Sequence, residues 1–124
     1  MTAVAAVLTS MLAILSVFQI ALACGAPLGR FAWGGAHTTL PLGLRFAAAS
    51  AVLRYLFIGF IAFDRAGAIA VLPREFSFWV MWLIVAHLGF SAILSLLSAS
   101  RHERMTLAPY TLVMGLLSLL IALR

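Results

Sequence analysis

Residues 3–23 form a mostly apolar run without a single charged side chain. As a helix, a run of this length can cross the hydrocarbon core of a bilayer, which is about 30 Å thick. Three more apolar runs follow, at residues 46–63, 76–98 and 107–123. The alternation typical of barrel strands is absent, and backbone groups in lipid must be satisfied within their own segment, so the runs predict helices. We therefore expect an all-α fold, a four-transmembrane-helix bundle forming one domain over residues 1–124, with both termini on the same side.

The composition supports lipid as the solvent for most of this chain. Hydrophobic residues make up 65% of it and charged residues only 9%, against about half and about a quarter in a typical soluble domain. The net charge of +5 comes entirely from arginine. The arginines stand singly between apolar runs and form no basic stripe, so we expect the lipid bilayer as a partner and no nucleic acid.

Four spans place the first and third connections, residues 24–45 and 99–106, on one side of the membrane. These two connections carry four arginines, and the opposite side carries three. Because arginine is enriched in cytoplasmic loops, this distribution predicts that residues 24–45 and 99–106 are cytoplasmic.

The first connection, residues 24–45, is rich in glycine and proline. Gly29 and Gly34 have the spacing of a phosphate-binding P-loop, but Gly35 stands where that motif needs lysine. Glycine supplies positive φ angles and proline fixes its own φ. We therefore expect an ordered, repeatedly turning loop at the membrane surface rather than a nucleotide site.

Three motifs resemble those of a family of small four-helix bacterial integral membrane proteins. They are GAPLGRFAWGG at residues 25–35 with His37 after it, LPLGLR at residues 40–45, and SASRHER at residues 98–104 before Pro109. The family pattern is GAPxGRxAWGG, LPxxLR and SxSxxER. The resemblance implies a bacterial inner-membrane, multi-pass protein, and no established activity goes with it. Members often have Asn where this chain has Ser95.

The first candidate site lies in the two connections expected on the same membrane face. It consists of the basic, acidic and aromatic side chains there: Arg30, Trp33, His37, Arg45, Glu103 and Arg104. Glu103 is the only carboxylate on that face, so a bidentate pair with one of the arginines would clamp the two loops together. Alternatively, the basic side chains bind an anionic lipid headgroup or a small anion, with the tryptophan at headgroup level.

A second group of polar residues lies inside the predicted spans. Arg54 follows Arg45 by nine positions, about 13 Å along a helix, and His87 is expected at a similar depth. Ser91 and Ser95 follow His87 at four-residue steps, on the same helix face. Such a face serves helix packing. Arg54 either extends to the membrane surface or marks a cavity or a bound anionic ligand.

The spans carry no pair of carboxylates, and the sequence contains no HExxH motif and only one cysteine. We therefore predict that the protein is not an enzyme and has no metal or cofactor. The composition favours an accessory or scaffold subunit of a membrane complex, which packs against another membrane protein or a second copy of itself. The alternative is a small oligomeric transporter or channel for an anionic or lipophilic small molecule, and a third is an intramembrane enzyme acting on lipids.

Overall fold

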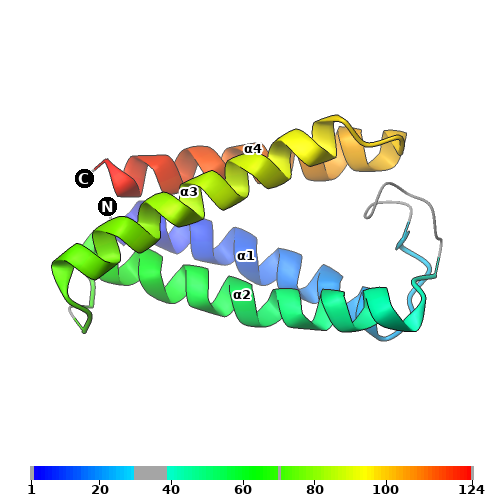
Figure 1. The fold of residues 1–124 in the computed structure, drawn as a ribbon, viewed down its shortest axis with the longest axis horizontal. Helices are drawn as coiled ribbons and strands as arrows, with labels where there is room; N and C mark the ends of the chain where they lie inside the picture. The colour runs from blue at the N-terminus through cyan, green and yellow to red at the C-terminus, as the bar shows by residue number, and fades with distance from the viewer. Residues whose placement is uncertain (1, 30–38, 70, 124) are drawn as a thin grey trace.

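The structure is a computed structural model that describes residues 2–29, 39–69 and 71–123. These residues form four helices and no strand: α1 (Thr2–Ala23), α2 (Leu42–Ala66), α3 (Arg74–Leu96) and α4 (Arg101–Ala122) (Figure 1). Each helix is long and apolar enough to cross a membrane. The predicted all-α fold with four transmembrane helices is therefore confirmed, and the chain is a multi-pass membrane protein.

The helices are arranged as two hairpins. Helix α1 packs along α2, and α3 packs along α4. The hairpins meet at the end of the bundle that holds the α2–α3 connection, the start of α1 and the end of α4 (Figure 1). They diverge toward the other end, where the α1–α2 and α3–α4 connections lie (Figure 1). We call the first the closed end and the second the open end.

The largest cluster of buried apolar side chains lies toward the closed end. It takes residues from the start of α1 and α3 and from the end of α2 and α4, among them Ala5, Leu8, Ile61, Met81 and Ile121. The outward faces are also apolar, with large side chains such as Leu53 and Leu83 exposed. Exposed apolar surface of this extent fits contact with lipid tails.

Helix α4 begins at Arg101, six residues before the predicted start at 107. Ser100 caps the helix, because its Oγ accepts a hydrogen bond of 3.3 Å from the main-chain N–H of Glu103. A carboxylate in the first turn also interacts favourably with the positive end of the helix dipole. Pro109 consequently lies inside the helix, whereas the predicted start at residue 107 would have placed it in the first turn.

The first connection is shorter than predicted, because α2 begins at Leu42 and not at residue 46. The residues between α1 and α2 are thus 24–41, and positions 30–38 lie outside the described part of the chain. Helix α1 ends at Ala23, just before Gly25 adopts a positive φ of 92°. That conformation suits glycine and stops the helix.

Asp64 organises the connection between α2 and α3. Its side chain is buried near the end of α2 and accepts hydrogen bonds of 3.0 Å from the main-chain N–H groups of Val71 and Leu72. The hydroxyl of Ser77, in the first turn of α3, donates to the same carboxylate. These bonds satisfy a buried charge with three donors and fix the turn.

Arg65 adds a second polar tie at the closed end. Its guanidinium donates a hydrogen bond of 3.4 Å to the carbonyl of Ala122 in α4, and it lies 5.4 Å from the centre of the Phe78 ring in α3. The second contact has the geometry of a cation–π interaction. Asp64 and Arg65 therefore hold three helices together where the hairpins meet.

Candidate functional site

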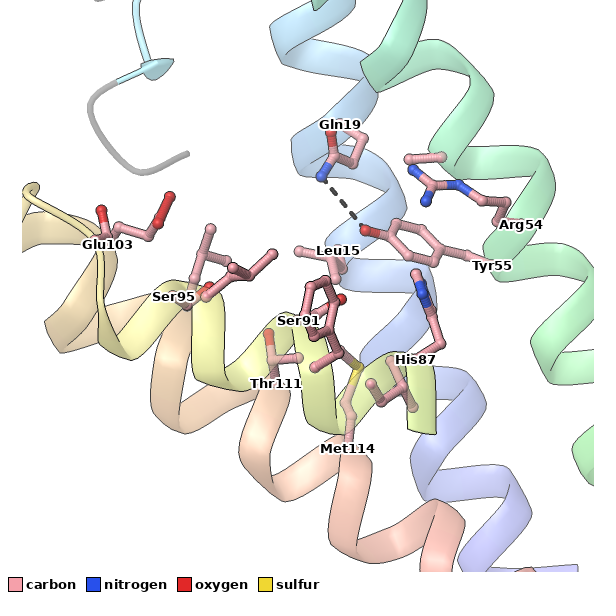
Figure 2. Close-up of a pocket in the computed structure, with 16 residues that line it drawn as sticks. Leu15, Gln19, Arg54, Tyr55, His87, Ser91, Ser95, Glu103, Thr111 and Met114 are labelled. Atoms are coloured by element: carbon pink, nitrogen blue, oxygen red, sulfur yellow. Dashed lines mark hydrogen bonds between the residues drawn. The ribbon is translucent and has the colours of Figure 1, made fainter. Parts of the chain in front are cut away.

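A cavity of about 520 Å³ lies between the two hairpins, in the half of the bundle nearer the open end. All four helices contribute to its wall. Its polar lining includes Arg54, Tyr55, His87, Ser91, Ser95 and Glu103 (Figure 2). An aqueous or polar cavity is where ionisable side chains within membrane helices are normally found.

One face of α3 forms a wall of the cavity. His87, Ser91 and Ser95 follow one another at four-residue steps, so the helical period places them in one row. All three line the cavity. The polar face expected from the sequence is thus turned toward the space between the hairpins.

Arg54 stands in the middle of α2, twelve positions after Leu42 and twelve before Ala66. Twelve residues correspond to about 18 Å of helix in each direction. The guanidinium extends from α2 toward the cavity (Figure 2). Among residues 2–29, 39–69 and 71–123 it has no hydrogen-bond or ion-pair partner. Arg54 is exposed, and its side chain lines the cavity at the middle of a helix long enough to cross a membrane.

Tyr55 and Gln19 complete this part of the wall. Gln19 in α1 donates a hydrogen bond of 3.4 Å from Nε2 to the Tyr55 hydroxyl in α2. The buried Oε1 of Gln19 accepts no hydrogen bond from the described residues. Tyr55 and His87 both lie within electrostatic range of Arg54. The cavity thus presents an unused acceptor, a phenol and an imidazole around one guanidinium.

Tyr55 was not singled out from the sequence. A tyrosine in an apolar span is itself a signal, because a buried phenol usually needs a polar partner. Its position next to Arg54 places it about 100° further around the helix, which alone does not indicate that both side chains reach the same cavity.

The candidate loop site is only partly within the described residues. Arg30, Trp33 and His37 lie outside them. Glu103 is 6% exposed and lines the cavity at the end away from Arg54 (Figure 2). The structure therefore joins Glu103 to the same cavity as the intramembrane polar residues.

The two described arginines of this site bond to main-chain carbonyls. Arg45 donates from Nε to the carbonyl of Leu40 at 3.0 Å, and Arg104 donates from Nη1 to the carbonyl of Ser98 at 2.7 Å. Each arginine thereby braces the connection next to its own helix. The clamp between Glu103 and an arginine stays a prediction.

Gly25 makes room for Arg45. A Cβ atom at Gly25 would lie 3.0 Å from Nη2 of Arg45 and 3.2 Å from its guanidinium carbon. The two ends of the first connection are therefore in contact, with the arginine side chain between the glycine and the Leu40 carbonyl. This contact gives a physical reason for a glycine and an arginine at these two positions.

The cavity wall carries several side chains that can donate hydrogen bonds to an anion. A guanidinium offers several donors in a fork that matches a carboxylate or a phosphate, and the serine hydroxyls and the imidazole can donate as well. Within the described ranges no group of three His, Cys, Asp or Glu side chains could hold a metal ion.

No family model, curated protein or solved structure matches this chain. The fold and the cavity define a multi-pass helical membrane protein with a chamber of mixed polar and apolar lining between two helical hairpins.

Proposed function

We propose that this protein binds a small anionic molecule in the cavity between its hairpins and acts as a small transporter. The observation that carries the proposal is Arg54, a cation at mid-span that lines the cavity and makes no ion pair with a described residue; Glu103 lies at the far end of the cavity. Placing an arginine at the centre of a membrane helix is unfavourable by about 2.5–3.5 kcal/mol on insertion scales. An anionic ligand would offset that cost.

The surroundings of Arg54 favour an anion over a cation. His87, Ser91 and Ser95 add hydrogen-bond donors along α3. Hydrogen bonds between ionised partners are stronger than neutral ones, and the low dielectric of the membrane strengthens them further. Glu103, the acidic residue in the wall, lies at the opposite end of the cavity (Figure 2).

The position of the cavity also supports transport. The closed end is filled with apolar side chains and tied by Asp64 and Arg65, whereas the cavity occupies the half toward the open end. A binding site near the middle of the spans, with one end of the bundle closed by packed side chains, is what alternating access requires. An accessory subunit needs only a packed interior, so a polar chamber is not expected of it.

The bacterial inner membrane is the proposed location. The support for it is the resemblance of residues 25–35, 40–45 and 98–104 to the small four-helix bacterial proteins. The arginine distribution supports an orientation with the open end in the cytoplasm.

Native mass spectrometry of the protein gently extracted from its membrane tests the binding step. We expect the wild-type protein, as a monomer or homo-oligomer, to retain an anionic small molecule that Arg54→Gln loses. Arg74→Gln is the matched control, because Arg74 is an exposed arginine at the closed end and does not line the cavity.

Transport is then tested with the retained molecule itself. Proteoliposomes containing wild-type protein should take it up, and those containing Arg54→Gln should not. Adducts that persist unchanged in Arg54→Gln would contradict the proposal. A chain that carries no ligand and is bound to a different membrane protein would favour the accessory-subunit function.

A further inference from the structure

A second cavity adjoins the first. It is a groove of about 370 Å³ between α2 and α3, and besides Arg54 and His87 its wall is apolar: Phe57, Ile58, Val80, Leu83 and Ile84. Arg54 and His87 line both the polar cavity and this groove. The two spaces therefore meet at this pair of residues.

The groove and the polar cavity extend in opposite directions from the shared pair. Ile58 lies four positions beyond Arg54 in α2, about 6 Å toward the closed end. Val80 lies seven positions before His87 in α3, about 10 Å in the same direction. The polar cavity instead continues toward Ser98, at the open end.

The groove is open to the surrounding lipid. Phe57 and Leu83, one from each helix, are 50% and 68% exposed. A hydrocarbon chain can thus enter between α2 and α3 from the side without passing through water. Its length of about 10 Å, set by the helical rise, suits one chain lying along the two helices.

We infer that the ligand is an anionic amphiphile with one hydrocarbon chain, whose head lies against Arg54 in the polar cavity and whose chain occupies the α2–α3 groove. This inference rests on the proposed function and adds the chemical class of the ligand and its route of entry. A soluble anion would need the polar cavity alone, whereas this arrangement joins a charged head site to an open apolar groove.

The free energy of binding should come mainly from the head. Lipid tails are as apolar as the groove, so a chain that moves from the bilayer into the groove gains little. The contact between the head and Arg54 pairs two charges in a low-dielectric medium, so it stabilises the complex more than the chain does. The groove then selects the shape of the ligand, while the chain concentrates the ligand in the bilayer, an advantage that acetate lacks.

Photolabelling of the full chain in phosphatidylcholine nanodiscs tests this inference. The probe is dodecanoic acid with a photoreactive diazirine near its methyl end. We expect label on residues 57–58 of α2 and 80–84 of α3, displaced by unlabelled dodecanoate and not by acetate at the same concentration.

Two substitutions separate the head from the chain. Arg54→Gln should lower labelling at least about tenfold, since bonds between ionised partners are lost. Leu83→Trp fills the groove and should lower labelling about fivefold. Val80→Phe is a second variant that fills the groove and should lower labelling as well. Arg74→Gln and Leu53→Trp are the controls, because Leu53 is 70% exposed and lines neither space. Circular dichroism and monodisperse elution establish that each variant is folded.

The outcomes distinguish this inference from the proposed function. In one outcome, acetate competes as well as dodecanoate, and labelling falls with Arg54→Gln but not with the groove variants. That outcome would overturn the inference that the ligand is an amphiphile and leave anion binding intact. In another outcome, Leu83→Trp lowers labelling of the groove and Arg54→Gln does not. The probe would then enter the groove only because it is apolar, and the inference would be overturned. Labelling that none of the variants changes would overturn both.

Discussion

The hydroxyl of Ser77 in α3 donates a hydrogen bond to the carboxylate of Asp64 in α2, thirteen positions earlier in the chain. The same carboxylate accepts the main-chain N–H groups of Val71 and Leu72. One buried acidic side chain thereby satisfies three donors at the point where the two hairpins are connected. The turn between α2 and α3 depends on it, because the buried hydroxyl of Ser77 and the partly buried N–H groups of Val71 and Leu72 would otherwise lose their partner.

Replacing Asp64 by alanine should therefore destabilise the fold strongly. A buried donor left without a partner costs about 1–3 kcal/mol, and the two partly exposed N–H groups cost less because water can reach them, so we expect a loss of about 2–4 kcal/mol in the free energy of unfolding. Thermal unfolding of the detergent-solubilised protein, followed by circular dichroism, measures the change. Ser77→Ala removes only one bond and should lose less. Glu75→Ala, at an exposed neighbour, serves as the control, and equal stability of Asp64→Ala and Glu75→Ala would refute the assignment.

Tyr110 provides a direct tie between the hairpins. Its hydroxyl, in α4, donates a hydrogen bond to the main-chain carbonyl of Met11 in α1. Hydrogen bonds between membrane helices contribute about 0.6 kcal/mol on average and up to about 1.7 kcal/mol. Tyr110→Phe keeps the ring and should lower the free energy of unfolding by about that amount. If the Tyr110→Phe variant is as stable as the wild type, the hydrogen bond contributes nothing to the stability of the folded bundle. Ser50→Ala, on an exposed face, is the control.

Gly25 and Gly43 should respond to alanine in opposite directions. Gly25 has a φ of 92°, and an added Cβ would lie 3.0 Å from Arg45, so Gly25→Ala should destabilise by about 1–2 kcal/mol or more. Gly43 lies in the first turn of α2 with no atom within 4 Å of an added Cβ. Gly43→Ala should be neutral or stabilise by up to about 1 kcal/mol through helix propensity. Thermal unfolding of the pair measures both effects, and a loss at Gly43 equal to that at Gly25 would contradict the geometry.

The four spans could be predicted from the sequence because hydropathy is a property of each segment alone. The start of α4 could not be predicted from hydropathy, since residues 101–106 are mostly polar and their helix depends on capping. A signal was nevertheless present, because Ser100 and Glu103 have the spacing of a capping box. Local side-chain patterns therefore locate helix ends that apolar runs miss.

Only part of the candidate site could likewise be predicted from the sequence. The row of His87, Ser91 and Ser95 follows from the helical period and could be predicted. That Glu103 lines the same cavity as Arg54 depends on how far the hairpins diverge, which no single segment determines. The role of Asp64 likewise depends on contacts between two helices and the turn that joins them.

The final prediction separates a binding role of Arg54 from a structural one. If Arg54 is present for a ligand, the empty protein bears an unfavourable charge at the bilayer centre. Arg54→Leu should then raise the free energy of unfolding by about 1–3 kcal/mol, within the insertion cost of arginine, and abolish retention of the anionic ligand. Arg45→Leu is the matched control, because Arg45 bonds to the Leu40 carbonyl and packs against Gly25. That variant should destabilise the fold. Thermal unfolding and native mass spectrometry on both variants test the prediction, and a loss of stability in Arg54→Leu comparable to that in Arg45→Leu would assign Arg54 to the scaffold.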